Sequence, residues 1–345
     1  MSDNLLLSDL NIISLQTQDI ADICNSRHHI LQTSAKSDPD VDAVSTLEFY
    51  LSQSTASETR RAYGADLRHF AGWGGEIPAG PKLVATYLCE CAGNLGLAVS
   101  TIKRRVAAIA WAHREEGLDD PTKTEIVRKA IRGIERHHGN TPKQAVPLFL
   151  RDIESMGRVL LGRARDRRDM GLMLVGYFGG FRGSELVGLN VEDFFSDESG
   201  LLIKLGKSKT DQTARGRWIS IPAGGDDLCP VKAVADWLAM LNRDEGPMFP
   251  SISRYGNISE KALTVRSLTR ILLKRAEAAG MNADGLSSHS IRAGFVTESI
   301  AQGEQPMLVA NQTGHSSPEM LARYLRPVTR EMRRMQGKHD ENSPD

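Results

Sequence analysis

Six polar residues in the second half of this 345-residue chain are of types that can act together on a phosphodiester. They are two arginines, a lysine, two histidines and a tyrosine, namely Arg182, Lys209, His289, Arg292, His315 and Tyr324. In-line attack on a phosphodiester builds negative charge on the non-bridging oxygens, which paired arginine donors stabilise well. A tyrosine hydroxyl, with an ordinary pKa of about 10, becomes a nucleophile only beside such groups. The set therefore predicts covalent phosphoryl transfer.

The spacing of these residues predicts that several of them meet. His289 and Arg292 lie at positions i and i+3 of a predicted helix that Ser288 can cap, near an N-terminus that favours an anion. His315 follows in a turn, 23 residues after Arg292, and Tyr324 comes nine residues later. A single histidine and arginine at this spacing would mean little, so the prediction depends on the whole set.

Neither a metal nor a nucleotide is needed for this chemistry. Lys209 lies in a polar loop between two predicted strands, where a lysine can give a proton to a departing 5′ oxygen. Gly206, Lys207 and Ser208 resemble the end of a P-loop, but the segment before them is typical of a strand. No group of His, Asp and Glu has the spacing of metal ligands. We expect no cofactor and no metal.

The chain is predicted to fold into two units, of which the second contains all six residues. An all-α unit is expected over residues 45–138, because apolar residues recur there with the helical period between glycines and prolines. Its fourth helix is predicted to begin at Pro121 and to place Ile126, Val127 and Ile134 inward. Residues 139–147 have the composition of a linker.

Residues 148–327 are predicted to form an α+β unit with a small antiparallel sheet, so the fold class is mainly α. We expect two short strands, joined by a long polar loop, at residues 201–205 and 218–221. Helices are expected at residues 231–241, 267–279, 288–302 and 318–326. Residues 328–345 are predicted to contain a short helix too small to be stable unless it docks.

The net charge is zero, but its distribution is uneven. Residues 1–50 contain two Lys/Arg against eight Asp/Glu, whereas residues 51–150 contain 14 against 10. We therefore expect an acidic flexible arm at residues 1–44 and a basic body that meets a polyanion. Six basic residues are predicted to contact DNA, with a solvated charged surface as the alternative: Lys103, Arg104, Arg105, Lys129, Arg132 and Arg136.

Cysteine content and hydropathy indicate the cellular compartment in which the protein works. Four scattered cysteines do not form a disulfide framework, and no run approaches the ~18 apolar residues of a membrane helix. The N-terminus is acidic, unlike that of a signal peptide. We expect a cytoplasmic protein without membrane contact.

Four motifs contain the six residues: GGFRGSEL around Arg182, GKSKT around Lys209, HSIRAGFVT with His289 and Arg292, and TGHSSPEMLARYLRP with His315 and Tyr324. In order and spacing they resemble the tyrosine site-specific recombinases of the phage integrase family, including Cre-like enzymes. The predicted helical unit is similar to the core-binding domain of that family. The resemblance spans about residues 50–336.

The resemblance implies how the phosphate is held and attacked. Tyr324 would be the nucleophile that forms a 3′-phosphotyrosyl DNA intermediate. Arg182 and Arg292 would bind the scissile phosphate. Glu185, one helical turn after Arg182, matches an acidic position that supports the site.

The resemblance also assigns the proton transfers. Lys209 would act as the general acid on the 5′ oxygen, His289 would assist proton transfer, and His315 would hydrogen-bond a phosphate oxygen. Because the phosphotyrosyl bond conserves the energy of the broken bond, a 5′ hydroxyl could reseal it without ATP.

At the level of the assembly, the resemblance implies a C-shaped clamp in which both domains embrace double-stranded DNA. Four copies would act on two paired recombination sites through a Holliday junction, linked by the helix of residues 328–345. The alternative for that helix is docking on its own domain. The target sequence and any accessory protein are left unspecified.

Two other functions fit parts of the pattern. A relaxing type IB topoisomerase or a hairpin-forming resolvase would use the same chemistry without exchange between paired sites. A DNA-binding protein without catalysis would be expected to lack at least one of the six residues, and all six are present.

Overall fold

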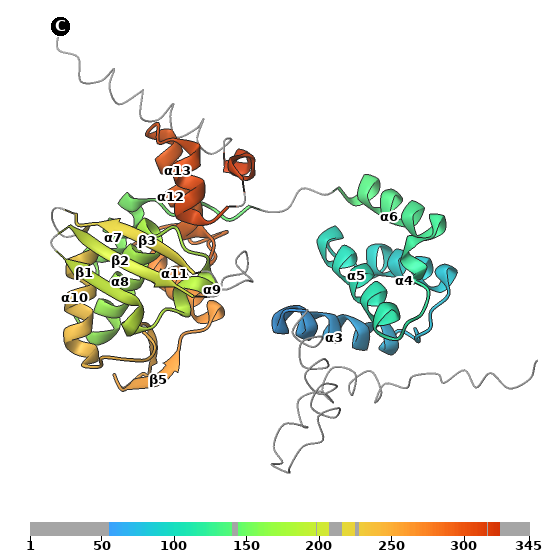
Figure 1. Cartoon of the computed structure of the whole chain (residues 1–345), viewed down its shortest axis with the longest axis horizontal. Helices are drawn as coiled ribbons and strands as arrows, with labels where there is room; N and C mark the ends of the chain where they lie inside the picture. The colour runs from blue at the N-terminus through green and yellow to red at the C-terminus, as the bar shows by residue number, and fades with distance from the viewer. Residues whose placement is uncertain are drawn as a thin grey trace, which may run out of the picture. The chain divides into compact units, whose positions relative to one another are not determined.

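The computed structural model describes residues 55–139, 144–197, 199–206, 216–224, 228–315 and 317–324. The chain divides into two compact units between Lys143 and Gln144, a boundary that falls within the predicted linker (Figure 1). The predicted acidic arm, the general-acid candidate Lys209 and the predicted helix of residues 328–345 lie outside the described residues.

The N-terminal unit is built from helices only, within the ranges that the structure describes. They are α3 (Ser57–Gly72), α4 (Pro81–Gly93), α5 (Val99–Glu115), the 3-10 turn η1 (Pro121–Lys123) and α6 (Glu125–His138). Aromatic and aliphatic side chains close the core between them; Phe70 and Tyr87, both fully buried, meet with ring centroids 4.8 Å apart. The prediction of an all-α unit here is confirmed.

The prediction for its last helix is wrong at the start. Pro121 opens only the turn η1, whose N-cap Asp120 accepts a hydrogen bond from the Thr122 N–H, and α6 begins four residues later. The phase of α6 is set by Val127 and Ile134, which are buried seven residues apart. Ile126 is consequently 47% exposed rather than inward.

The C-terminal unit combines helices with two antiparallel sheets. Its helices are α7 (Leu150–Arg158), α8 (Ala164–Phe178), α9 (Gly183–Val187), α10 (Pro230–Leu241), α11 (Val265–Ala278), α12 (Ser290–Ala301) and α13 (Pro306–Thr313), with 3-10 turns η2 (Val191–Asp193) and η4 (Pro318–Tyr324). Its strands are β1 (Phe194–Asp197), β2 (Gly200–Leu205), β3 (Arg217–Pro222), β4 (Pro250–Ile252) and β5 (Ile258–Ala262).

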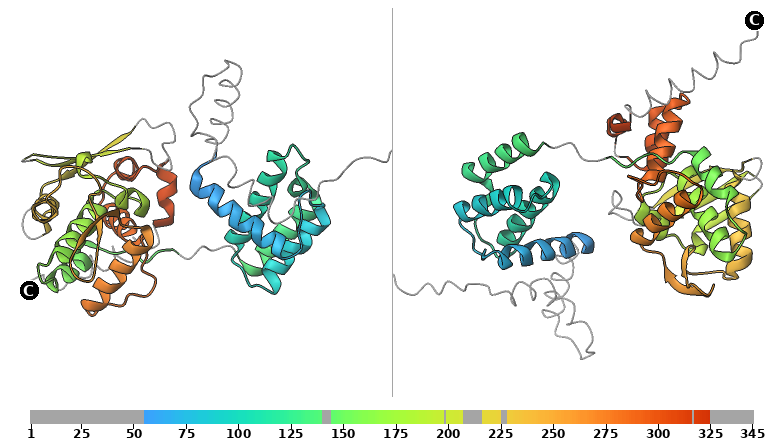
Figure 2. Two further views of the ribbon diagram at one scale, coloured as in Figure 1. Left: turned by 90° about the horizontal axis from the view of Figure 1, so that it is seen from below. Right: turned by 180° about the vertical axis from the view of Figure 1, so that it is seen from behind.

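The larger sheet has the order β1-β2-β3 and confirms the two predicted strands as β2 and β3. Ile203 pairs with Ile219, and both are buried, whereas Leu202 and Trp218 on the opposite face are 42% and 52% exposed. Seen edge-on, the sheet has helices on one side (Figure 2). The alternation of side chains along a strand explains this pattern, because successive residues point to opposite faces.

Helix α8 forms the centre of the C-terminal core. Its residues Leu172, Met173, Leu174 and Val175 are fully buried, which a helix achieves only when it is covered all round. At its N-terminal half, Asp169 accepts hydrogen bonds from both Arg168 and Arg275, so these buried charges are paired. The predicted apolar helix before Arg182 corresponds to α8.

Two helix starts differ from the predictions. Helix α12 begins at Ser290 with His289 as its N-cap residue, so Ser288 is not the cap. The segment leading to Tyr324 is a 3-10 turn rather than an α-helix. In the described ranges no helix is long and apolar enough to cross a membrane. Within the same ranges no cluster of three or more His, Cys, Asp or Glu could hold a metal ion.

Candidate active site

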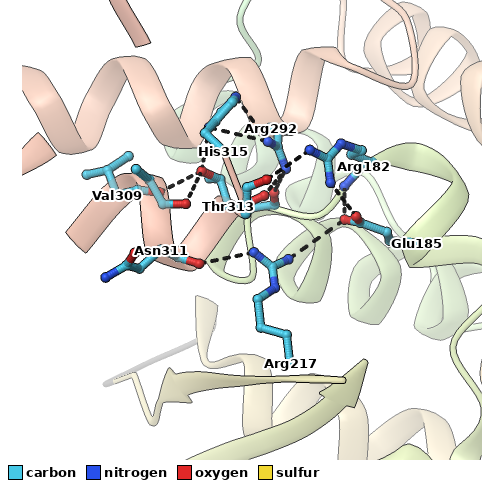
Figure 3. Close-up of polar contacts among 11 residues, drawn as sticks. Arg182, Glu185, Arg217, Arg292, Val309, Asn311, Thr313 and His315 are labelled. Carbon is cyan, nitrogen blue, oxygen red and sulfur yellow. Dashed lines mark hydrogen bonds and ion pairs between the residues drawn. The ribbon is translucent and has the colours of Figure 1, made fainter. Parts of the chain in front are cut away.

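The C-terminal ends of α8 and α13 and the starts of α9 and α12 bring together two arginines and a histidine from distant parts of the chain. Arg182, Arg292 and His315 lie in one connected set of polar contacts, with Glu185 beside Arg182 (Figure 3). Arg182 and Arg292 each donate a hydrogen bond to the backbone carbonyl of a residue more than 110 positions away in the sequence.

Arg182 is the N-cap residue of α9, and Glu185 is the third residue of that helix. One Glu185 oxygen accepts the Arg182 Nη1 donor at 2.6 Å, and the other accepts the Arg182 backbone N–H at 2.8 Å. The Arg182 Nη2 atom donates to the Gly314 carbonyl at 3.0 Å. These contacts fix the guanidinium at both ends, while the side chain keeps 16% of its surface exposed.

Arg292 is held more deeply and is only 4% exposed. Its Nη1 atom donates to the carbonyls of Gly180 and Thr313, at 2.8 and 2.6 Å. Burial first, and then the like charge of Arg182, lower the pKa of Arg292 to about 10. A bound phosphate anion would offset that cost, because opposite charge favours the protonated guanidinium.

His315 has a defined tautomer in this arrangement. Arg292 Nη2 lies 3.0 Å from Nε2 and 3.4 Å from Nδ1, and arginine has no acceptor, so the shorter contact makes Nε2 the acceptor and leaves the ring proton on Nδ1. The Nδ1–H donates to the hydroxyl oxygen of Thr313 at 2.7 Å. That hydroxyl in turn donates to the Val309 carbonyl at 2.6 Å. A neutral imidazole is therefore oriented by α13.

Tyr324 ends η4 and lies next to His315, with ring centroids 6.2 Å apart. It packs on a small apolar cluster that includes Val296, Val309 and Leu321. The tyrosine is thus placed beside the histidine and the buried arginine from a third element. The arrangement brings together a candidate nucleophile, two guanidinium groups that can stabilise negative charge, and an imidazole that contacts one of them.

The catalytic roles of all six residues stay predictions, including those of His289 and Lys209. His289 is exposed at the start of α12, and its backbone N–H donates to the Ser287 hydroxyl at 3.3 Å. Lys209 belongs to the connection between β2 and β3, outside the described residues. Their parts in proton transfer therefore rest on the sequence.

Two glycines permit the close packing of this site. Gly180 and Gly314 both have positive φ angles, of 57° and 66°, a conformation that favours glycine. A Cβ atom on Gly180 would lie 2.7 Å from the Thr313 methyl carbon. The carbonyls of both glycines accept arginine donors, so the turns present acceptors where the guanidinium groups need them.

Sequence reasoning missed a third arginine in the site. Arg217, the first residue of β3, donates from Nη1 to the Asn311 carbonyl at 3.0 Å and lies 4.0 Å from Glu185 (Figure 3). The alternation of residues along β3 could have revealed it, because Arg217 lies on the same face of the strand as the buried Ile219 and Ile221. An arginine at an inward position of a strand indicates a buried charged partner.

The predicted DNA-contacting residues of the N-terminal unit have different environments. Lys129, Arg132 and Arg136 lie along α6; Arg132 is half exposed and pairs with Glu125 at 2.7 Å. On α5, Lys103 is exposed and pairs with Glu135.

Two arginines of α5 are occupied within the N-terminal unit. Arg104 makes two hydrogen bonds to Asp66, at 2.7 and 3.0 Å. Arg105 is 8% exposed and donates to the Cys91 sulfur at 3.0 Å. Burial of this kind gives Arg105 a packing role rather than a place on the surface.

Comparison with known proteins identifies the family. The phage integrase family model matches residues 149–331. An integrase/recombinase XerD homolog of Selenomonas ruminantium is 30% identical, over 80% of this chain and 83% of that protein. The Cre recombinase of Escherichia phage P1 is 24% identical, over 74% of this chain and 78% of the Cre chain.

Solved structures show the same fold. The XerH site-specific recombinase in a post-cleavage complex with its difH substrate superposes with a TM-score of 0.61 at 16% identity, covering 93% of each chain. A lambda integrase dimer bound to a core site gives a TM-score of 0.58 at 16% identity, covering 82% of this chain and 93% of that one. With its family match over more than half the chain, this protein belongs to the phage integrase family and is a tyrosine site-specific recombinase.

Proposed function

We propose that this protein cleaves and rejoins double-stranded DNA at specific sites, with Tyr324 as the nucleophile. The observation that carries the proposal is the convergence of Arg182, Arg292 and His315 beside Tyr324. Two guanidinium groups and an imidazole are suited to stabilising the oxygens of one phosphodiester.

In the first step the Tyr324 oxygen attacks the scissile phosphorus and the bond from phosphorus to the 5′ oxygen breaks. The tyrosine hydroxyl loses its proton, with His289 as the assisting group, and the departing 5′ oxygen gains a proton from Lys209. Arg182 and Arg292 would face the charge that builds on the non-bridging oxygens. His315 would add a hydrogen bond to a phosphate oxygen once Nε2 has gained a proton and its contact with Arg292 has opened. Attack by a 5′ hydroxyl on the phosphotyrosine reverses the step and releases the tyrosine.

The N-terminal unit would hold the DNA. Lys129, Arg132 and Arg136 form a row of cations on α6, with Lys103 and Arg104 on α5. Such cations bind phosphates and release counterions without reading sequence. Both units would embrace the duplex as a C-shaped clamp, and a DNA enzyme of this kind would work in the cytoplasm.

Recombination between two sites would require a tetramer. A lambda integrase structure with a TM-score of 0.55 is a tetramer bound to a Holliday junction. We infer that residues 328–345 of one protomer dock on the next. The C-terminal unit offers a pocket of about 730 Å³ lined by apolar side chains, such as Phe178 and Phe295, and by polar ones, such as Glu298 and Gln302. Such a mixed lining suits an amphipathic helix.

The test is covalent trapping with Tyr324→Phe as the paired variant. The full chain would be incubated with DNA that flanks its own gene, denatured, and analysed for protein–DNA adducts with free 5′ hydroxyl ends. We expect adducts with the unchanged chain and none with Tyr324→Phe, which lacks the nucleophilic oxygen but should bind DNA equally well. Adducts that survive the substitution would remove Tyr324 from the mechanism.

The same assay separates the competing functions. Tight DNA binding without any adduct would favour a non-catalytic DNA-binding protein. Adducts accompanied by relaxation of supercoils, without exchange between two sites, would favour a topoisomerase. Mapped adduct positions followed by exchange between paired copies of that site would establish recombination.

A further inference from the structure

Arg217 is placed inside the site but has no part in the chemistry described so far. It stands at the base of the β2–β3 hairpin, and its side chain is 24% exposed. Its Nη1 atom donates to the Asn311 carbonyl at the end of α13, and its Nη2 atom lies 4.0 Å from a Glu185 oxygen. One guanidinium therefore connects the sheet with α13 and α9.

Arg217 also supports the turn before His315. A Cβ atom on Gly314 would lie 2.3 Å from Arg217 Nη1, so the guanidinium packs directly on the Gly314 backbone. The Gly314 carbonyl accepts the Arg182 Nη2 donor. Arg217 thus contacts the turn that both holds Arg182 and leads into His315.

Charge gives a second connection to Arg182. The Glu185 oxygen nearest Arg217 already accepts the Arg182 N–H at 2.8 Å. Arg217 Nη2 is buried and makes no hydrogen bond within the described part of the chain, so Glu185 is its nearest counter-charge there. Burial, and the like charge of Arg182, lower the pKa of Arg217, whereas Glu185 raises it. Without Arg217, the Glu185 charge would act on Arg182 alone.

We propose that Arg217 is a positioning residue for DNA cleavage. By sharing Glu185 with Arg182 and packing on Gly314, it keeps the Arg182 guanidinium and His315 aligned with the scissile phosphate and leaves the Arg182 charge available to it. The proposal rests on the proposed function, because it concerns the same phosphate site.

The test compares full-length Arg217→Ala and Arg217→Lys with Arg243→Ala as a matched control. Arg243 also donates to a backbone carbonyl of the same unit, that of Ser259 at 3.1 Å. It is not one of the three arginines of the site. The substrate is a nicked duplex that spans the cleavage position mapped by Tyr324 trapping. Single-turnover adduct formation and DNA affinity are measured for each chain.

We expect Arg217→Ala to form adducts roughly 10- to 100-fold more slowly, as is typical when a group that orients an active-site side chain is removed. DNA affinity should stay within about threefold, since one interior charge is lost rather than a row of phosphate contacts. The adduct-forming rate of Arg217→Lys should lie between those of the unchanged chain and Arg217→Ala, because lysine keeps the positive charge but can make only one of the two contacts. Arg243→Ala should match the unchanged chain.

A modified phosphate distinguishes positioning from a general loss of folding. In a duplex with a methylphosphonate at the scissile position, attack builds one less negative charge, so the demand on Arg182 is relaxed. The rate ratio between the unchanged chain and Arg217→Ala should shrink there to less than about fivefold. A merely misfolded variant would be equally impaired on both substrates.

Three results would overturn the inference. The first is Arg217→Ala cleaving as fast as Arg243→Ala. The second is an equal loss of binding and cleavage. The third is a defect that persists on the methylphosphonate but disappears with a 5′-bridging phosphorothiolate, whose sulfur departs without a general acid. If Arg217→Ala does not fold, Arg217→Lys carries the same comparison. Absence of adducts with the unchanged chain would instead contradict the proposed function.

Discussion

At the residue scale, the site depends on a relay of hydrogen bonds that ends on the main chain. Arg292 donates to His315, His315 donates to Thr313, and Thr313 donates to the Val309 carbonyl. The direction of the relay follows from its ends, because arginine only donates and the single hydroxyl proton of Thr313 goes to a carbonyl, that of Val309 being nearer than that of Ala310. Thr313 is fully buried, so its hydroxyl has no access to water.

Thr313→Val tests this relay with a side chain of nearly the same shape. We expect a loss of stability of about 1–2 kcal/mol, because the partly buried His315 Nδ1–H loses the Thr313 hydroxyl as its acceptor. Adduct formation should slow by about tenfold as the imidazole loses its orientation. Unfolding by denaturant and single-turnover trapping measure the two effects.

Thr313→Ser is the matched control for that substitution. Serine restores the hydroxyl and removes only a methyl group, so His315 regains its acceptor. Recovery of the rate with serine would support the relay. If valine and serine behave alike, the hydroxyl does not orient His315.

At the scale of elements, α12 is packed against the chain that enters the C-terminal unit. The Leu148 N–H donates to the Ser290 carbonyl at 2.9 Å. A Cβ atom on Gly294 would lie 1.8 Å from the Leu148 carbonyl oxygen. Glycine at this position lets the helix that carries Arg292 approach a neighbouring backbone at contact distance.

Gly294→Ala is therefore expected to destabilise the C-terminal unit by about 2 kcal/mol or more, because the two backbones must separate. Gly133→Ala is the control, since Gly133 lies in α6 and a Cβ atom there would meet no other segment within 4 Å. There alanine should stabilise by up to about 1 kcal/mol through its better helix propensity. Thermal unfolding of both variants would show opposite shifts, and shifts of the same sign would contradict the packing argument.

At the scale of the whole molecule, the roles that we propose in catalysis and in DNA binding fall on separate units. The arginines of the site belong to the C-terminal unit, whereas the cations of α6 belong to the N-terminal unit. The zero net charge of the chain conceals this basic helix. A protein with such a division should lose binding and cleavage through different substitutions.

Lys129→Ala combined with Arg132→Ala tests the N-terminal unit. Removing two phosphate contacts should weaken DNA binding broadly and reduce the slope of log affinity against log salt by about 1.8. The measurement is a titration of binding at several salt concentrations. Arg243→Ala with Arg254→Ala removes the same charge beside β4 and β5, outside the row of cations proposed to hold DNA, and should change the slope less. If the double substitution in α6 leaves the slope unchanged, that helix does not contact DNA phosphates.

Residue types and spacing were enough to predict the fold class and the strands β2 and β3. They also selected Arg182, Arg292, His315 and Tyr324 as candidates. Their types and order define a phosphodiester chemistry, and the period of apolar residues defines most helices. Local patterns of this kind are encoded within a few residues of each position, which is why they can be interpreted without coordinates. Misplaced boundaries, such as the start of α6, arose where a proline opened a turn instead of a helix.

How these residues are held depends on contacts that form only in the folded chain. The acceptors of Arg292 are carbonyls of Gly180 and Thr313, 112 and 21 residues away in the chain, and backbone carbonyls leave no trace in a residue pattern. For the same reason Arg217 was missed and Arg105 was assigned to DNA, since an arginine counts as a surface residue until its burial is known. Burial and partners result from contacts between distant segments, and these exist only once the chain has folded.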